Sequence, residues 1–162
     1  MSLVYLILGG NRGNRREIIS SAIDLVTSKI GRKISASTLC ESESWGFSSE
    51  LFVNQVIAIE TDMSPNEILI TSKQIEVQLG RVRNSGGYEA RTMDIDLLYY
   101  DSVVLDSPGL TIPHPRIADR RFVLVPLAEI APDFIDPLSG KKVIEMLQEC
   151  TDPSKVWRLE ET

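Results

Sequence analysis

The sequence predicts an α+β fold in which helices pack on a mainly antiparallel sheet. Short apolar runs rich in β-branched residues alternate with longer segments whose apolar residues recur at helical spacing. A glycine or a helix-capping residue stands at most of the boundaries between them. With 162 residues and ordinary apolar and charged fractions, the chain can bury a proper core and is not disordered. We therefore expect a single domain over residues 1–162.

The first strand and the first helix are marked by their ends. Residues 3–8 are a short apolar run that closes at Gly9 and Gly10, which suggests a central strand. Asn14 can cap a following helix, and Glu17 stands three residues later, as in a capping box. Apolar residues then recur at helical spacing until Gly31, where we expect the helix to end.

The next elements are two strands and a second helix. A strand is expected at about 33–41, a loop at 42–50, and a third strand at 52–61, where β-branched residues gather. The sequence Ser-Pro-Asn-Glu at 64–67 then places a capping serine, a first-turn proline and a glutamate where a helix start needs them. This helix should run to Gly80.

A fourth strand, within 90–100, follows the loop at 84–90 and completes the order β-α-β-β-α-β. That order is typical of a ferredoxin-like sandwich with a split βαβ arrangement. From about Ser107 the chain is rich in proline and should form an extension of the same fold, with a short helix at 122–130.

Charge and cysteine content exclude several classes. The net charge of −6 argues against a general nucleic-acid or anionic-membrane binder. Cys40 and Cys150 form neither a disulfide framework nor a zinc motif, and we expect Cys40 to lie buried in a strand. The apolar start of the chain is too short to cross a membrane and lacks the features of a signal peptide. We therefore expect a soluble, cytoplasmic protein.

Two carboxylates in the fourth strand are the main functional signal. Side chains at positions i and i+2 of a strand share one face, so Asp94 and Asp96 should point the same way, with Cα atoms about 6.5–7 Å apart. Such a pair repels unless a positive group lies nearby. Mg²⁺ and a structural arginine partner such as Arg91 are both consistent with the spacing. Six arginines and no lysine between residues 81 and 121 favour a metal–triphosphate site.

Two other features are weaker. LGGNRGN at 8–14 lacks the glycine pattern of a dinucleotide-binding loop and the lysine of a P-loop, so a tight turn with close backbone packing is favoured. His114, the only histidine, lies in a loop close to Arg116 and Arg120. It can serve either as a phosphate contact or as an ordinary loop residue.

Four segments together resemble the 6-hydroxymethyl-7,8-dihydropterin pyrophosphokinase family. They are LGGNRGN (8–14), QLGRVRN (78–84), ARTMDIDLLYY (90–100) and IPHPRIADRRFVLVPLAEIAPDF (112–134). The resemblance implies an enzyme of folate biosynthesis with a ferredoxin-like fold. It would transfer diphosphate from ATP to the hydroxymethyl group of the pterin, release AMP and use two Mg²⁺ ions.

The resemblance also implies roles for individual residues. Asp94 and Asp96 would be the metal ligands, and Arg83 and Arg91 would take part in catalysis. The residues that would bind ATP are Glu76, Arg81, Arg91, His114 and Arg120. The residues that would bind the pterin are Ser42, Trp45, Phe52, Asn54, Tyr88 and Phe122.

The chain departs from the family at two loops. Positions that are often rich in proline read SESWGFSS here, and Tyr88-Glu89-Ala90 replaces a frequent Trp-Gly-Pro. The alternatives to the pyrophosphokinase are another Mg²⁺-dependent nucleotidyl or phosphoryl transferase, a ligand-binding regulatory module and an RNA-binding domain. The acidic balance and the lack of an RNP-type aromatic motif weigh against RNA. We expect a monomer, because no large apolar stripe is left unassigned.

Overall fold

The computed structural model describes residues 1–10, 14–43, 51–80 and 93–159. Their elements are, in chain order, β1 (Ser2–Gly10), α1 (Arg15–Lys29), β2 (Arg32–Ala36), β3 (Cys40–Ser42), β4 (Phe52–Thr61), α2 (Pro65–Gly80), β5 (Asp94–Tyr100), β6 (Leu105–Ser107), β7 (Leu110–Ile112), the 3-10 helix η1 (Ile117–Asp119), α3 (Arg121–Ile130), α4 (Val143–Glu149) and β8 (Val156–Arg158).

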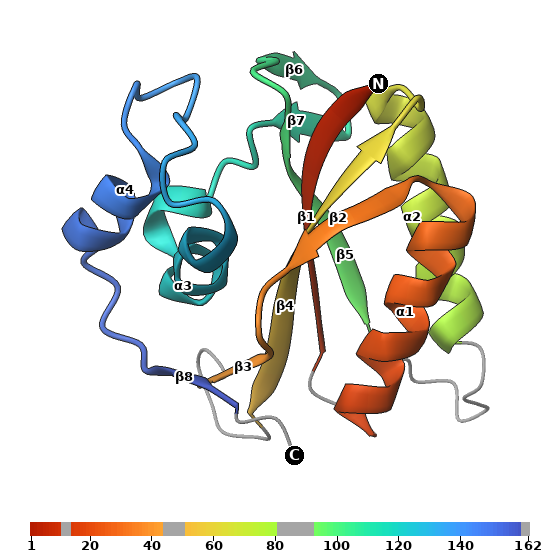
Figure 1. Ribbon diagram of the computed structural model, residues 1–162, viewed down its shortest axis with the longest axis horizontal. Helices are drawn as coiled ribbons and strands as arrows, with labels where there is room; N and C mark the ends of the chain where they lie inside the picture. Colours follow the sequence, from red (N-terminus) through yellow and green to blue (C-terminus); the bar gives the residue numbers. More distant parts are fainter. Residues whose placement is uncertain (11–13, 44–50, 81–92, 160–162) are drawn as a thin grey trace.

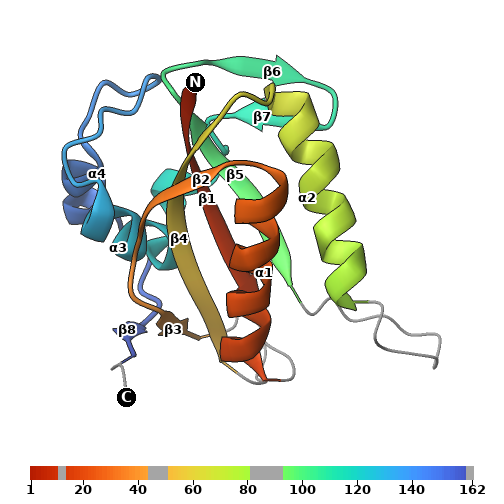
Figure 2. The same ribbon diagram turned by 45° about the vertical axis from the view of Figure 1, so that its right-hand side comes forward.

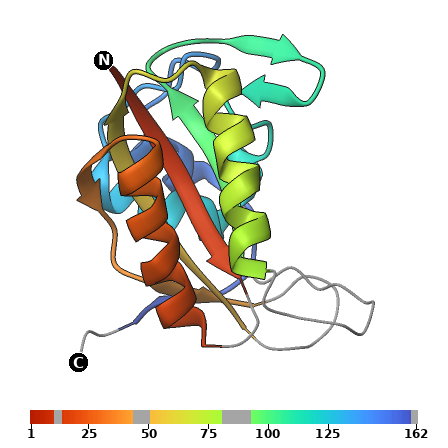
Figure 3. The same ribbon diagram turned by 90° about the vertical axis from the view of Figure 1, so that its right-hand side faces the viewer.

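The main sheet has the strand order β5-β1-β4-β3-β8, with β2 also paired to β4, and every pairing is antiparallel. Helices α1 and α2 lie side by side on one face of it (Figure 3). The predicted ferredoxin-like order is therefore confirmed. A separate hairpin, β6–β7, projects from one end of the sheet (Figure 2).

The C-terminal extension covers the opposite face. Figure 1 shows α3 and α4 on the side of the sheet away from α1 and α2. The sheet is thus buried between two apolar clusters, a first core beneath α1 and α2 and a second core beneath α3 and α4. The short helix predicted in the extension is confirmed as α3, but its place on this second face is not visible in the sequence.

The local signals for helix starts are confirmed. The Asn14 side chain accepts a hydrogen bond from the backbone N–H of Glu17. Before α2, the Ser64 hydroxyl accepts from the Glu67 N–H, and the Glu67 carboxylate accepts from the Ser64 N–H. Both helices are therefore fixed by residues within four positions of their first turn.

The second predicted strand is broken into β2 and β3. Between them the Ser37 hydroxyl accepts a hydrogen bond from the Val56 N–H at 3.0 Å, in place of a regular ladder bond. The Glu129 carboxylate of α3 accepts from both the N–H and the hydroxyl of Thr38. This break turns the chain so that β3 continues along β4 beneath α3.

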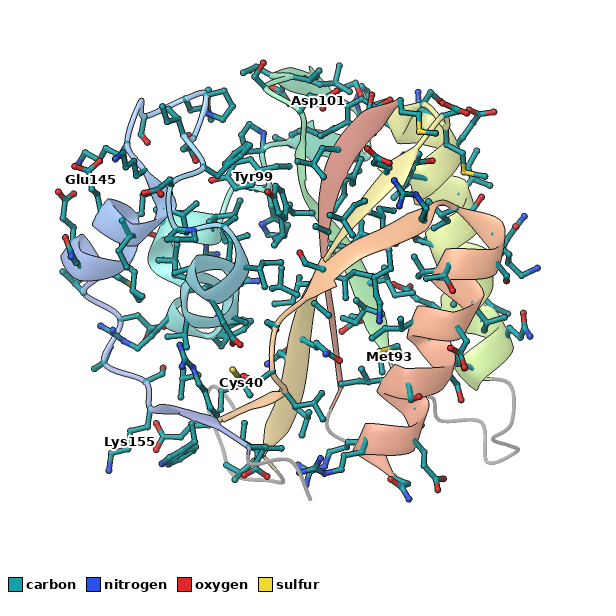
Figure 4. All side chains as sticks on the ribbon, viewed as in Figure 1. Cys40, Met93, Tyr99, Asp101, Glu145 and Lys155 are labelled. Carbon is teal, nitrogen blue, oxygen red and sulfur yellow. The ribbon has the colours of Figure 1, made fainter. Side chains whose placement is uncertain are left out.

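Strand β5 contributes to both cores because its side chains alternate between the two faces, and a β-bulge places two successive residues in the second core. Leu97 pairs with Leu6 and Tyr99 pairs with Tyr5, so Leu98 is the extra residue. Before the bulge Met93 and Ile95 belong to the first core, whereas Leu98 and Tyr99 belong to the second. Figure 4 shows Met93 and Tyr99 on opposite sides of the sheet.

Both cysteines are free thiols. Cys40 is buried in β3, as predicted, and Cys150 is half-buried. Within the ranges given above, no helix is long and apolar enough to cross a membrane.

Candidate active site

The site is built on one register row that crosses three strands. Gly9 of β1 pairs with Asp94 of β5 on one side and with Asn54 of β4 on the other. Residues paired across a sheet present their side chains to the same face. A carboxylate and an amide are thus placed on the face beneath α3, on either side of a glycine.

A pocket of about 470 Å³ lies above this row. Its sheet side consists of residues from β1, β4, β5 and the end of β3: Ile7, Gly9, Ser42, Glu43, Phe52, Asn54, Asp94, Asp96 and Leu98. Its other side consists of residues around η1 and the start of α3: His114, Arg116, Arg120, Phe122 and Val123. The structure therefore brings together residues that lie more than 100 positions apart in the chain.

The two aspartates line this pocket on the same strand face, as predicted from their spacing. Asp94 is half-buried and Asp96 is exposed, while Ile95 between them points into the first core. Carboxylate oxygens are the ligands that Mg²⁺ prefers, and the ion usually keeps water and substrate phosphate as further ligands. Among the residues described, no group of three or more His, Cys, Asp or Glu side chains could hold a metal ion. The donor set is therefore a carboxylate pair, which fits an ion that arrives with phosphate oxygens.

Asn54 is a buried polar side chain at the other end of the row. It is 5% exposed, and its amide Nδ2 donates a 3.4 Å hydrogen bond to the Ser42 hydroxyl. Gly9 makes room for it, because a Cβ added to Gly9 would lie 2.0 Å from Asn54 Oδ1. A side chain other than hydrogen at position 9 would therefore push the amide out of place.

His114 lies opposite the carboxylates. Its backbone N–H donates to the Leu98 carbonyl at 3.1 Å, which ties the loop to β5. Burial lowers the pKa of His114 below its usual value and the charges of Arg120 and Arg116 lower it too, while the Asp96 carboxylate acts in the other direction. The imidazole is therefore neutral at pH 7. Its Nδ1 accepts from the Arg116 N–H at 3.1 Å, so the proton is on Nε2, which can donate to a ligand.

Arg120 and Phe122 complete the wall at the start of α3. The guanidinium of Arg120 lies 5.6 Å from the centroid of the Phe122 ring, within the range of a cation–π contact. The pocket wall therefore carries an aromatic ring, that of Phe122, next to the charged guanidinium of Arg120.

The predicted site residues are distributed unevenly. Eight of them line the pocket: Ser42, Phe52, Asn54, Asp94, Asp96, His114, Arg120 and Phe122. Five others lie outside the described residues: Trp45, Arg81, Arg83, Tyr88 and Arg91. Glu76 is on α2 and does not line the pocket. Its carboxylate accepts a 2.8 Å hydrogen bond from the N–H of Ile95, the residue between the two aspartates.

Two charged residues and one glycine of the pocket were not assigned to a functional site from the sequence. Glu43 and Arg116 line it with charged side chains, and Gly9 forms part of its floor. Gly9 lies inside β1, which runs to Gly10, so its role is the close packing predicted for LGGNRGN and not the turn itself. Arg116 was visible in the arginine group, but nothing in the sequence distinguished Glu43.

Known proteins match most of this chain. A sequence model described as 7,8-dihydro-6-hydroxymethylpterin-pyrophosphokinase (HPPK) matches residues 5–132. A 2-amino-4-hydroxy-6-hydroxymethyldihydropteridine pyrophosphokinase from Porphyromonas gingivalis is 39% identical over 82% of this chain and 92% of its own. One of the same name from Methylorubrum extorquens is 36% identical over 99% of this chain and all of its own.

Solved structures agree in fold. Plasmodium falciparum HPPK-DHPS superimposes with a TM-score of 0.76 at 15% identity and covers 91% of this chain. This chain spans 41% of that longer protein. The length of the family match, and the identity and coverage of the relatives of similar length, are greater than chance similarity gives. The chain belongs to the 7,8-dihydro-6-hydroxymethylpterin-pyrophosphokinase family.

Proposed function

We propose that the pocket above the Asp94–Gly9–Asn54 row is the active site for the family's reaction, a diphosphate transfer in folate biosynthesis. The terminal diphosphate of ATP is transferred to the hydroxymethyl oxygen of 6-hydroxymethyl-7,8-dihydropterin, and AMP is released. The observation that supports this assignment is that one pocket holds a carboxylate pair at β5 and a buried amide at β4, two strands away. The carboxylates that would bind phosphate through a metal ion and the amide that would bind the pterin ring are therefore separated by one strand, β1.

The pterin binds at the end formed by β4 and β3. Asn54 presents its amide to the polar edge of the ring, and the Ser42 hydroxyl fixes the orientation of that amide. Phe52 and Phe122 supply aromatic faces on the pocket wall. A flat ring held in this way directs its hydroxymethyl group towards β5.

The triphosphate binds at the end formed by β5 and the loop at His114. Asp94 and Asp96 would hold two Mg²⁺ ions, which when bound neutralise phosphate charge. His114 donates from Nε2 and Arg120 from its guanidinium to phosphate oxygens. A neutral histidine is suited to this role, because its Nε2–H can donate a hydrogen bond to a phosphate oxygen without a change in its own protonation.

The reaction is a displacement at the β-phosphorus. The hydroxymethyl oxygen forms its bond to that phosphorus while the bond to the α–β bridging oxygen breaks, and AMP leaves with the electron pair. The hydroxyl proton passes to solvent water, and no side chain is assigned as its base. Catalysis depends on holding the two substrates in line and on stabilising charge, which are the functions that this wall and floor can perform.

The test is AMP release by the purified protein mixed with ATP, Mg²⁺ and 6-hydroxymethyl-7,8-dihydropterin, with each component omitted in turn. AMP that requires all three supports the proposal and its metal dependence. A folded protein that releases no AMP, or releases it without pterin, contradicts it. The monomeric state and the cytoplasmic location stay predictions.

A further inference from the structure

The last described stretch of the chain connects the two sides of the pocket. Residues 150–158, called the C-terminal strap below, run from the start of α3 to the edge of β3 (Figure 1). The strap lies beyond residues 5–132, the part of the chain that the family's sequence model matches. The match to the sequence model therefore assigns no role to the strap.

One end of the strap caps α3. The residue before α3, Arg120, offers no side-chain cap to the helix. Instead, Asp152 Oδ2 accepts a 2.9 Å hydrogen bond from the backbone N–H of Arg121, the first residue of the helix. The first free N–H of α3 is thus satisfied by a carboxylate that lies 31 residues later in the chain.

The contact is reciprocal. The Arg121 side chain donates from Nε to the Asp152 carbonyl at 2.9 Å and from Nη2 to the Cys150 carbonyl at 3.0 Å. Its guanidinium is therefore used by the strap, in contrast to that of its neighbour Arg120, which lines the pocket. Two adjacent arginines in the sequence have different tasks.

Asp152 is itself held in place. It is 7% exposed, and its Oδ1 accepts hydrogen bonds from the N–H and the hydroxyl of Ser154 at 2.9 and 2.7 Å. Burial raises the pKa of this carboxyl, but the hydrogen bonds from Arg121 and Ser154 outweigh burial and bring the pKa below its usual value. The group that caps α3 is consequently an anion at neutral pH.

The other end of the strap is fixed to the pterin side of the pocket. Strand β8 pairs with β3, and Val156 lies opposite Ser42. The Lys155 N–H donates to the carboxylate of Glu43, a pocket residue, at 3.1 Å. Figure 4 shows Lys155 and Cys40 at the end of the molecule where these strands meet.

We propose that Asp152 is a positioning residue for the reaction. It fixes the first turn of α3 through the Arg121 N–H, and so sets the orientation of Arg120 and Phe122, the two neighbours of Arg121 that line the pocket. This inference rests on the proposed function, because it assigns Arg120 to ATP and Phe122 to the pterin. It predicts that loss of the cap weakens both substrates together, although Asp152 does not line the pocket itself.

The test compares Asp152→Ala, which removes the side-chain acceptor that caps α3, with Asp136→Ala. Asp136 is a suitable control because it is also a buried aspartate, 5% exposed, that accepts hydrogen bonds from the backbone N–H groups of Leu138 and Ser139. Asp136 does not line the pocket, and neither of these hydrogen bonds involves the first turn of α3. Both variants should lose thermal stability, which melting curves followed by circular dichroism will measure.

Binding and turnover should then separate the two variants. At a temperature where both are folded, Asp152→Ala should lower kcat/KM for ATP and for the pterin by about 10- to 100-fold, because a small displacement of positioned groups has effects of this size. Calorimetry should show weaker binding of a non-hydrolysable ATP analogue and of the pterin. Asp136→Ala should change neither constant by more than about twofold. Should Asp152→Ala fail to fold, Ser154→Ala removes one of the bonds that hold the capping carboxylate and should lower both kcat/KM values to a smaller extent, whereas unchanged values would overturn the positioning role.

The outcomes are distinguishable from failure of the proposed function. Wild-type protein that does not release AMP contradicts the proposed function itself. Active wild-type protein with an Asp152→Ala variant as active as Asp136→Ala overturns the positioning role alone. The same is true if only one substrate is affected, since Arg120 and Phe122 flank the same capped residue.

Discussion

Replacing Gly9 by alanine changes the centre of the pocket floor by a single methyl group. That carbon would lie 2.0 Å from Asn54 Oδ1, 3.0 Å from Asn54 Cγ and 3.1 Å from the Val53 carbonyl oxygen. Ordinary contact begins near 3.4 Å, so the amide oxygen has to retreat by about 1.4 Å. The neighbour that must move far is the end of a side chain, whereas the Val53 carbonyl has to shift by only a few tenths of an ångström, so the backbone of β1 and β4 can stay paired.

A retreat of this size removes the amide from its present position beside Ser42. The hydrogen bond between Asn54 Nδ2 and the Ser42 hydroxyl is already 3.4 Å long and would be lost. If Asn54 binds the polar edge of the pterin, one or two hydrogen bonds to the ring are lost as well, each worth about 0.5–1.5 kcal/mol. We expect KM for the pterin to rise about 10- to 100-fold in Gly9→Ala, while KM for ATP stays within about twofold.

The assay is pterin-dependent AMP release, with melting curves to confirm the fold. Gly31→Ala is the matched control, because a Cβ there would lie 2.2 Å from the Glu60 carbonyl oxygen and 2.9 Å from Thr61 Cβ, far along β4 from the pocket. A backbone oxygen cannot move aside as a side chain can, so Gly31→Ala should lose more stability and keep its pterin KM. A folded Gly9→Ala enzyme with normal pterin KM would refute the role given to Asn54.

Three further predictions concern the carboxylates, the second core and the buried thiol. Asp96→Ala should fold normally but release almost no AMP, and an active variant would contradict the metal assignment. Tyr99→Phe should lower the free energy of unfolding in urea by about 1.5–3 kcal/mol, because the phenol donates a 2.6 Å hydrogen bond to the buried Asp136 carboxylate; an unchanged unfolding curve would show that the bond contributes nothing. Burial, followed by the nearby Glu129 charge, raises the pKa of Cys40 to about 11. Alkylation of the folded protein at pH 8, read by peptide mass spectrometry, should therefore label Cys150 and spare Cys40, and labelling of both at similar rates would count against it.

The features that the sequence predicted are those that depend on neighbours in the chain. The start of α2 at Pro65 follows from Ser64 and Glu67, and the strand at 52–61 has the observed bounds of β4. The shared face of Asp94 and Asp96 follows from strand periodicity alone. These signals need no knowledge of what packs against them.

The features that were missed depend on partners far along the chain. The break between β2 and β3 is stabilised by Glu129 of α3, which is 91 residues away from Thr38. The different tasks of Arg120 and Arg121 are decided by Asp152, and a pair of adjacent arginines gives no sign of it. Glu43 enters the pocket because the chain ends β3 there, beside the strap. Such contacts become visible only when the tertiary structure is known.

The two sides of the pocket differ in how firmly the fold holds them. The floor is centred on β1 and β4, inner strands of the sheet that lie between two apolar cores, so their amide hydrogens should exchange only when most of the molecule unfolds. The wall at α3's first turn depends on one carboxylate of the strap, and it can open at a much smaller cost in free energy. A substrate that touches both sides would couple the two openings, and its binding should slow exchange in the strap far more than in β1. Substrate affinity and the local stability of the C-terminal strap would then be two measures of the same contact.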